Sequence, residues 1–315
     1  MIHEIFKENF WKGKKKYILA VSGGSDSMFL LDKMRQKEYD FVVAHVNYRK
    51  RQDSDFDERL VRDYCQKYSL NFEVKSVKET EYSPKINFQA QARKIRYDFF
   101  QELATKHQSK HIVIAHHYDD SLETYLLQKK RKSIVDYWGL PTKVKLGKFW
   151  ILRPLLLLNK SYICQYLSEK KITYANDITN QLAIYQRNIV RQELNNLSEE
   201  RKKELKEEID KKNQELKEVK KKVREIAKKL IVSRYVFQLC KKNQYSSEIY
   251  LRFVYYWINQ ATNGLLQQKK KQILKEIYKQ LFISKKKNLI IKLGNNFHII
   301  KGNNQVLISP IKILL

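Results

Sequence analysis

The chain of 315 residues contains few of the residues that interrupt or cross-link a fold, with 8 glycines, 4 prolines and 3 cysteines. So few prolines, together with 43% hydrophobic residues, exclude a collagen-like or Pro-rich disordered chain and allow a sizeable buried core. The cysteines, Cys65, Cys164 and Cys240, lie far apart and form no CxxC pair. They indicate free thiols in a reducing compartment, not a disulfide scaffold or a cysteine metal site.

Long hydrophobic runs are also missing from the sequence. No apolar stretch approaches the roughly 18 residues that a membrane helix needs. The first 16 residues, MIHEIFKENFWKGKKK, lack the apolar segment of a signal peptide. We therefore expect a cytoplasmic protein without a membrane segment, long enough for two or three modules.

Acidic residues are scarce relative to basic ones, at 34 against 63, which gives a formal net charge of +29. A charge of this size favours a polyanionic partner, and nucleic acid is the usual one. A compositional bias toward Lys, Asn, Ile and Tyr would raise the charge in the same way without any partner. Charge alone therefore favours RNA or DNA binding but does not decide it.

Residues 1–195 alternate short apolar runs with helix-like segments. The candidate strands are Tyr17–Ser22, Phe41–Val46, Asn71–Ser76 and His111–His116, and the helical stretches between them are Asp26–Glu38, Asp53–Tyr68 and Phe88–His107. This alternation predicts an α/β domain with a doubly wound parallel sheet, covered on both faces by helices. Ligands of such sheets bind at the carboxyl ends of the strands.

Beyond residue 195 the pattern changes twice. No glycine or proline occurs between Pro154 and Gly264, so we expect this stretch to be helical throughout, with a helical domain over residues 196–283. Apolar residues spaced by seven, three and four indicate a coiled-coil-like seam, and the mixed charges around it favour a solvated helical hairpin arm. The seam residues are Ile209, Leu216, Val219, Val223, Ile226 and Leu230. Residues 284–315 carry short β-rich runs separated by Gly-Asn-Asn turns, which predicts a small β-meander tail.

The strongest local motif is Ser22–Ser27, with the sequence Ser-Gly-Gly-Ser-Asp-Ser, between the apolar strand Tyr17–Val21 and a helix. Two glycines let the backbone approach an anion, and the helix N-terminus presents N–H groups and the positive end of its dipole. The loop has no Gly-Lys-Ser/Thr, so it is not the Walker loop of ordinary NTPases. Asp26 would repel a phosphate unless a cation bridged them, and it therefore implies Mg²⁺.

This loop resembles the SGGxDS signature of the PP-loop ATP pyrophosphatases, which cleave ATP between the α and β phosphates and adenylate a substrate. Further motifs follow in order: His45-Val46-Asn47-Tyr48, Ala92–Tyr97, Ala115–Thr124, Asp177–Asn180 and Arg187–Arg191. In this order and spacing the chain resembles the tRNA(Ile)-lysidine synthetases over roughly residues 15–195. From residue 199 onward the resemblance rests only on length and basic helical character.

The resemblance implies a reaction. ATP would adenylate the carbon-2 oxygen of the wobble cytidine in the CAU anticodon of tRNA(Ile), and the ε-amine of lysine would displace AMP to form lysidine. It also implies ATP and Mg²⁺ as cofactors, and tRNA(Ile) and L-lysine as partners. A homodimer is one arrangement that the sequence leaves open.

The expected roles of individual residues follow from the motifs. The ATP-binding set is Ser22, Gly23, Gly24, Ser25, Asp26, Ser27, His45 and Asn47; the catalytic set is Asp26, His116, Asp120 and Glu123; and Asp26 and Asp120 are the expected metal ligands. Spacings of four and three place His116, Asp120 and Glu123 on one face of a helix. Asp120 or Glu123 could hold Mg²⁺ or the lysine ammonium and accept a proton from that amine, with Asp120 favoured.

Four arginines are the expected contacts to tRNA or phosphate. Arg93 and Arg96 share a helix face at a spacing of three, and Arg187 and Arg191 share one at a spacing of four. Guanidinium groups bind phosphate oxygens in pairs, which suits an RNA backbone or the leaving pyrophosphate.

The chain departs from the family pattern at a few positions. Tyr48 stands where a second histidine is common, Gln89 replaces a usual glutamate, and Ser121 replaces a usual glutamine. A glycine-rich stretch is replaced by the basic Lys129–Lys132. None of these changes removes a candidate catalytic group.

Three other functions stay open at this point. A PP-loop tRNA thiolase would need paired reactive cysteines, and a small-molecule amidotransferase or NAD synthetase would not need a charge of +29. A non-catalytic RNA-binding protein would not need the carboxylates of Asp26, Asp120 and Glu123. Release of AMP that depends on tRNA and lysine would separate these alternatives.

Overall fold

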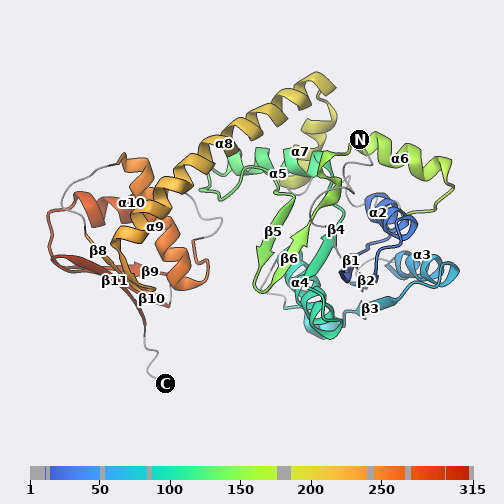
Figure 1. The fold of residues 1–315 in the computed structure, drawn as a ribbon, viewed down its shortest axis with the longest axis horizontal. Coiled ribbons are helices and arrows are strands. Elements are labelled where there is room, and N and C mark those ends of the chain that lie inside the picture. The colour runs from blue at the N-terminus through green and yellow to red at the C-terminus, as the bar shows by residue number, and fades with distance from the viewer. Residues whose placement is uncertain are drawn as a thin grey trace. The chain divides into compact units, whose positions relative to one another are not determined.

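The computed structural model describes residues 11, 15–49, 54–83, 87–175, 186–239, 245–266, 271–294 and 296–311 (Figure 1). The chain divides into two compact units. The first comprises Met1–Thr124 and Gly139–Leu197, and the second comprises Tyr125–Trp138 and Ser198–Leu315. Among the helices of the described residues, none combines the length and the apolar character that crossing a membrane requires.

The first unit is built on a six-stranded sheet in the order β3-β2-β1-β4-β6-β5. The strands are β1 (Tyr17–Ala20), β2 (Phe41–Asn47), β3 (Phe72–Ser76), β4 (His111–Ile114), β5 (Lys143–Leu146) and β6 (Phe149–Leu152). Neighbouring strands are parallel except β5 and β6, which pair antiparallel. The order reverses direction between β1 and β4, and such a switch point is where doubly wound sheets bind ligands.

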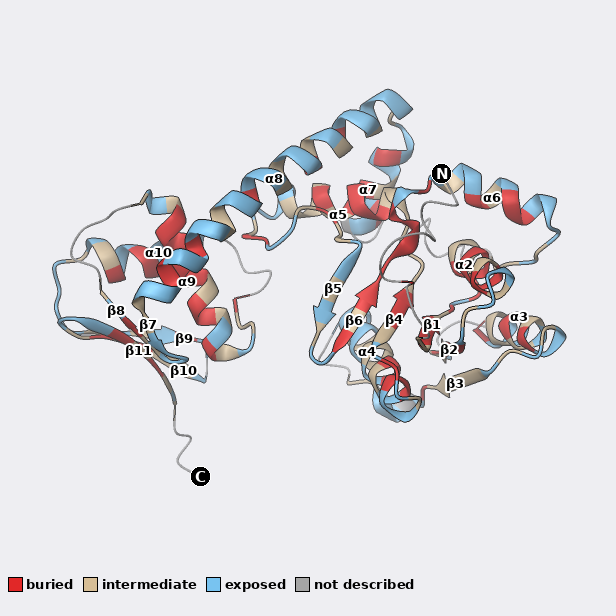
Figure 2. Ribbon diagram, viewed as in Figure 1, coloured by how far each residue is buried: buried red, intermediate tan, exposed pale blue. Residues whose placement is uncertain are grey.

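Helices cover both faces of this sheet. α4 (Phe88–Lys106) covers one face, and α2 (Ser25–Gln36), α3 (Ser54–Lys67) and α6 (Lys160–Glu169) cover the other. Two further helices are α5 (Tyr118–Lys130), whose residues from Tyr125 onward belong to the second unit, and α7 (Gln186–Asn195). Because side chains alternate along a strand, Ile18 and Val42 pack with Phe100 of α4 on one face. Leu19 and Val43 pack on the opposite face, in the core that contains residues of α2, α3 and α6. The predicted doubly wound α/β domain is confirmed. In Figure 2 much of β4 and β6 is red, whereas β3 is tan and β5 is mostly pale blue.

A buried carboxylate joins three helices of this unit. Asp32 of α2 accepts hydrogen bonds from Tyr64 of α3 at 2.5 Å, from Tyr166 of α6 at 2.6 Å and from Arg35 at 2.7 Å. Burial alone would raise the pKa of Asp32, but the hydrogen bonds from Tyr166, Tyr64 and Arg35 outweigh it and lower that pKa. The ionised form of Asp32 therefore stabilises the packing of α2 against α3 and α6.

In the second unit, residues Glu199–Leu230 form α8, a single helix of 32 residues. Ser198 caps it by accepting a hydrogen bond from the backbone N–H of Arg201 at 3.2 Å. The predicted apolar seam is largely confirmed, because Ile209, Leu216, Val223 and Ile226 are buried. The predicted hairpin is wrong: the charges alternate along one continuous helix, and no turn interrupts it.

The second unit also contains a five-stranded antiparallel sheet in the order β7-β8-β11-β10-β9. Its elements are β7 (Ile231–Ser233), β8 (Val236–Gln238), α9 (Ser247–Thr262), α10 (Lys271–Tyr278), β9 (Leu289–Leu293), β10 (Phe297–Lys301) and β11 (Gln305–Pro310). The β-meander of the tail is confirmed. Phe237 of β8 packs its ring on Trp257 of α9 with centroids 4.6 Å apart, so helices and sheet share one core.

The expectation of continuous helix up to Gly264 is wrong at residues 231–238, which form the β7–β8 hairpin. Ile231, Val232 and Val236 are β-branched, and the hairpin extends the sheet by pairing with β11. Tertiary pairing therefore overrides the absence of glycine and proline here.

Candidate active site

The loop Ser22–Ser27 connects the carboxyl end of β1 to the N-terminus of α2. Gly23 has φ +89°, and a Cβ at this position would lie 3.3 Å from the carbonyl oxygen of Asp57, so a glycine is required. The Ser27 hydroxyl donates to the carbonyl of Gly24 at 2.8 Å and accepts from the N–H of Ser22 at 3.2 Å. Gly24 caps α2 without a side-chain hydrogen bond, which leaves N–H groups at the start of this helix for a ligand such as phosphate.

A pocket of about 220 Å³ opens beside this loop, at the switch point of the sheet. Its lining at the loop comprises Ser22, Gly24, Asp26 and Ser27; its floor comprises Ala20, Ala44, Val46 and Ile114; and its walls include Tyr48, Arg96, Tyr97, Phe100, His116 and Asp120. An apolar floor with a polar, helix-capped end suits a nucleotide, whose base is apolar on its faces and whose phosphates are charged.

His45 and Asn47 do not line this pocket. Strand alternation directs Ala44 and Val46 toward the pocket and places His45 and Asn47 on the opposite face, toward α3. The Nδ1 of His45 is 2.9 Å from the carbonyl oxygen of Val21, and burial lowers the pKa of this histidine, which favours the neutral ring. Its Nε2 is buried without a hydrogen-bond partner among the described residues.

Asn47 donates through Nδ2 to Asp55 at 2.7 Å and to Glu58 at 3.0 Å, both on α3. The two residues therefore support the strand ends around the loop. The structure does not place them where they were predicted, in the lining of an ATP pocket.

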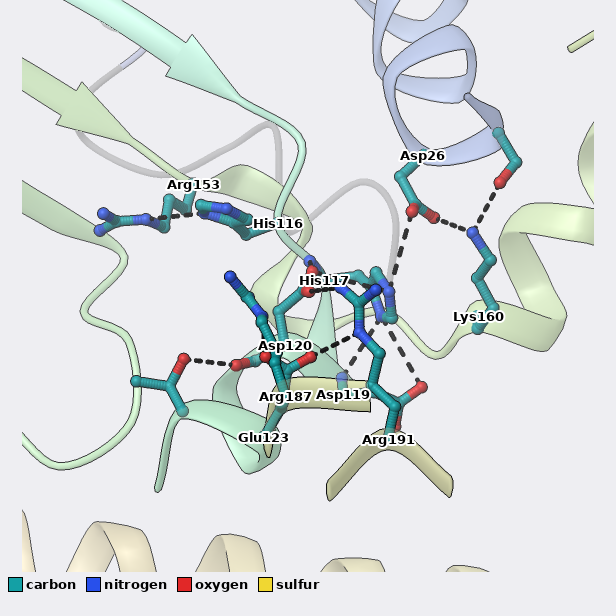
Figure 3. A network of polar contacts seen from close by, with 12 residues as sticks. Asp26, His116, His117, Asp119, Asp120, Glu123, Arg153, Lys160, Arg187 and Arg191 are labelled. Carbon is teal, nitrogen blue, oxygen red and sulfur yellow. Dashed lines mark hydrogen bonds and ion pairs between the residues drawn. The ribbon is translucent and has the colours of Figure 1, made fainter. Parts of the chain in front are cut away.

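Asp26 faces two cationic or hydrogen-bonding groups from distant parts of the chain (Figure 3). Its Oδ1 accepts a hydrogen bond from Nζ of Lys160 at 2.6 Å, and its Oδ2 lies 3.8 Å from Nε2 of His117. Lys160 also donates to Oγ of Ser25 at 2.6 Å. Lys160 was not among the predicted site residues. Its one sequence signal is that it opens a helix shortly after β6, a strand that the sequence analysis did not identify.

His117 precedes the first residue of α5 and caps this helix. Its backbone N–H donates to Oδ2 of Asp120 at 2.9 Å, and its ring Nδ1 accepts from the N–H of Asp119 at 3.3 Å. Because Nδ1 is an acceptor, the ring proton lies on Nε2. That atom is 3.8 Å from the carboxylate of Asp26 and 3.6 Å from that of Asp120, so His117 lies between the loop and α5.

His116 also lies before α5, so it does not share a helix face with Asp120 and Glu123 as predicted. Its Nδ1 accepts a hydrogen bond from Nε of Arg153 at 3.1 Å. Arg153 is itself buried and also donates to the carbonyl of Pro141 at 2.8 Å. Burial lowers the pKa of His116, and Arg153 adds to this effect against the opposing charge of Asp120. His116 is therefore neutral at pH 7 and presents an Nε2–H donor.

Asp120 is a buried anion. Burial would raise its pKa, but the neighbouring His117 ring and the hydrogen bond from the backbone N–H of His117 lower it below the usual range. The side chain therefore stays ionised at neutral pH. Its Oδ1 is also 3.8 Å from Nη2 of Arg191.

Glu123 is bound by two arginines of α7. Its Oε2 accepts from Nε of Arg191 at 2.6 Å, and its Oε1 accepts from Nε of Arg187. Because both carboxylate oxygens are engaged and the side chain is 2% exposed, Glu123 is placed to anchor these arginines beside Asp120. The motif Asp177–Asn180, which precedes α7, lies outside the described residues.

The two arginines of α4 have different surroundings. Arg96 lines the pocket. Arg93 is exposed and stacks its guanidinium over the ring of Tyr97, 4.7 Å from the centroid. Of this predicted pair, only Arg96 is placed to contact a ligand in the pocket.

The predicted metal ligands, Asp26 and Asp120, approach the same nitrogen of His117. In the part of the chain that the structure describes, three or more His, Cys, Asp or Glu side chains nowhere gather into a metal site. Mg²⁺ usually takes one or two protein carboxylates and completes its shell with water and substrate phosphates. The pair therefore fits Mg²⁺ that arrives with phosphates.

Comparison with known proteins identifies the family. A family model described as the PP-loop domain matches residues 1–198. In the solved structures, the chain is similar to a U34-tRNA thiolase from Methanococcus maripaludis, with a TM-score of 0.58 at 13% identity, over 68% of this chain and 76% of that one. At this identity the likeness shows the fold alone.

Curated relatives are more similar in sequence. The tRNA(Ile)-lysidine synthase of Mycoplasma mycoides subsp. mycoides is 37% identical over 276 residues, which cover 86% of this chain and 68% of the relative. That of Mesomycoplasma hyopneumoniae is 43% identical over 181 residues, 57% of this chain and 60% of the relative. Against that of Mesoplasma florum, at 42% identity, the match spans 64% of this chain and only 50% of the relative's length. The chain therefore belongs to the PP-loop family and, within it, to the tRNA(Ile)-lysidine synthases.

Proposed function

We propose that this protein ligates lysine to carbon 2 of the wobble cytidine in tRNA(Ile) with a CAU anticodon, converting ATP to AMP and pyrophosphate. The observation that carries the proposal is the juxtaposition of a phosphate-binding loop with a buried, ionised Asp120 across His117. A ligase of this kind must bind ATP and a cationic amine side by side. The names of the relatives supply the substrates.

The first step is adenylation. The carbon-2 oxygen of the cytidine attacks the α-phosphorus of ATP, the bond to the bridging oxygen breaks, and pyrophosphate leaves. The N–H groups at the start of α2 would bind the phosphates, and Arg96 on the pocket wall could contact the nucleotide or the RNA. Asp26 would hold Mg²⁺, which would neutralise charge on the leaving pyrophosphate, and Asp120 would remain available for the lysine amine.

The second step is aminolysis. The lysine ammonium loses a proton to solvent, the resulting ε-amine attacks carbon 2, the bond to the adenylate oxygen breaks, and AMP leaves. We assign the binding of the lysine ammonium to Asp120, because its lowered pKa keeps it anionic. A carboxylate with a low pKa suits the holding of an ammonium better than the acceptance of its proton. Glu123 is a weaker candidate because Arg187 and Arg191 already neutralise it.

The thiolase alternative is disfavoured by the two described cysteines. Cys65 is buried on α3, and burial raises the pKa of its thiol to about 12. Cys164 lies on α6, and neither residue lines the pocket. Low-pKa, accessible thiols are the ones that react.

The proposal is tested by AMP release from ATP in reactions that contain tRNA(Ile) and lysine, or lack one of them. We expect pyrophosphate release to require the tRNA, and AMP release to require both the tRNA and lysine. AMP release at the same rate without tRNA and lysine would contradict the proposal. Guanosine monophosphate and cytidine monophosphate, added in place of the tRNA, are the matched control for the requirement for RNA.

A further inference from the structure

The PP-loop of this chain contains a carboxylate and no cation of its own. ATP brings several negative charges to Asp26, and the helix dipole of α2 is equivalent to only about half a positive charge. The ammonium of Lys160 contacts the loop directly, at 2.6 Å from both Oδ1 of Asp26 and Oγ of Ser25. A cation therefore already lies where the phosphates would enter.

We propose that Lys160 is a phosphate-binding residue that transfers its ammonium from Asp26 to the β- and γ-phosphates when ATP binds. The transfer frees Oδ1 of Asp26 for Mg²⁺. Lys160 would then have the role that a lysine inside the loop has in Walker-type NTPases. This inference rests on the proposed function only in taking ATP as the ligand.

The backbone of Lys160 is fixed by the packing of its helix, whereas its side chain can move. It is the first residue of α6, and α6 packs on α2 through the rings of Tyr166 and Phe29, whose centroids are 5.0 Å apart. Tyr166 also donates to the buried Asp32. The Lys160 side chain is 39% exposed, so its end can move while its helix stays in place.

The ammonium of Lys160 can contact the loop and a phosphate at the same time. Lysine has three N–H donors, and Asp26 and Ser25 accept two of them. The third donor can therefore reach a phosphate before the bond to Asp26 breaks. A phosphate then competes with Asp26 for the remaining donors, while Mg²⁺ competes with Lys160 for Asp26.

The arginines of the site hydrogen-bond to groups outside the loop, and the charge of Asp26 also acts on Arg191. Arg187 and Arg191 are bound to Glu123, and Arg153 is bound to His116. Arg96 lies on the opposite wall, on α4. Lys160 hydrogen-bonds to two loop side chains, those of Asp26 and Ser25.

The test compares the affinities of ATP, pyrophosphate and AMP for the full chain without tRNA or lysine, by titration calorimetry with Mg²⁺ present. Lys160→Met keeps the length of the side chain and removes its charge. We expect ATP and pyrophosphate to bind about 10- to 100-fold more weakly, as for a lost charge-assisted hydrogen bond, and AMP within about twofold of the native value. Lys160→Arg should restore part of the affinity.

The matched control is Lys170→Met, at the other end of the same helix, which should bind all three ligands as the native chain does. Equal weakening for AMP and ATP would mean that Lys160 only supports the loop, and unchanged affinity for all three would exclude any role. A misfolded variant would lose binding sites for every ligand together, so the ratio of ATP to AMP affinity remains the readout. Native protein that binds no ATP would overturn the proposed function as well.

Discussion

Asp120 and Glu123 lie one helical turn apart on α5 and carry the same charge, yet their neighbours differ. Glu123 is neutralised by two arginines of α7, whereas Asp120 faces the two histidines and only approaches Arg191, at 3.8 Å. From sequence alone both acids were candidates for the lysine ammonium, with Asp120 favoured. The position of α7 distinguishes them, and sequence spacing does not reveal which acid the arginines bind.

Asp120→Asn should therefore impair the use of lysine more than the binding of ATP. The amide oxygen can still accept the N–H of His117, so the start of α5 is preserved, but the anion is lost. We expect kcat/KM for lysine to fall at least about tenfold while the ATP affinity stays within a few-fold. Steady-state kinetics at varied lysine and calorimetry with ATP measure the two quantities.

Asp119→Asn is the control for this prediction, because Asp119 is a neighbouring acid whose side chain is 29% exposed. It should keep the native kcat/KM for lysine. If Asp120→Asn transfers lysine as fast as the native enzyme, another acid holds the amine.

The apolar strands and the Ser22–Ser27 loop were predictable from the sequence. In each of them the local residue pattern favours the same structure that the packed sheet requires. β10 lies within the residues 284–315 that were predicted to be β-rich, and β1 begins at the predicted Tyr17. The edge hairpin β5–β6 was not predicted, because in β5 two lysines alternate with half-buried apolar residues over only four positions. Without β6, the contribution of Lys160 to the site could not be foreseen.

The helices α2, α3 and α6 should separate more easily at low pH, because Asp32 joins them. The folded state lowers the pKa of Asp32, so this contribution is present above the unfolded pKa of about 3.9 and is lost as the pH falls through the folded pKa. We expect Asp32→Asn to reduce the free energy of unfolding by about 1.5–3 kcal/mol at pH 7, and this difference to shrink below about pH 4. Urea unfolding at a series of pH values measures it.

Asp40→Asn provides the comparison, since the Asp40 side chain is 65% exposed and lies 3.8 Å from Lys16. An exposed pair of this kind contributes little to stability. A loss for Asp32→Asn no larger than that for Asp40→Asn, or one that does not depend on pH, would show that the buried carboxylate does not join the helices.

The excess of positive charge is the main evidence for a nucleic-acid partner that the amino-acid composition provides. If the charge of +29 contacts tRNA phosphates, the logarithm of the association constant should fall with the logarithm of salt concentration. The expected slope is about −0.7 to −0.9 for each phosphate neutralised. Filter binding or fluorescence titration of tRNA across a salt series measures it, with AMP binding as a low-charge control. A slope for tRNA as shallow as that for AMP would mean that the positive charge reflects a compositional bias and does not bind tRNA phosphates.

In the proposed reaction lysine becomes bonded to a cytidine of tRNA, and analysis of that nucleoside detects the new bond itself. The full chain is incubated with tRNA(Ile) that has a CAU anticodon, ATP and isotope-labelled lysine, and the digested tRNA is analysed by mass spectrometry. We predict one labelled cytidine derivative, at the wobble position, and none when ATP is omitted. A tRNA that carries no label after complete reaction, or carries it at another nucleotide, would contradict the account.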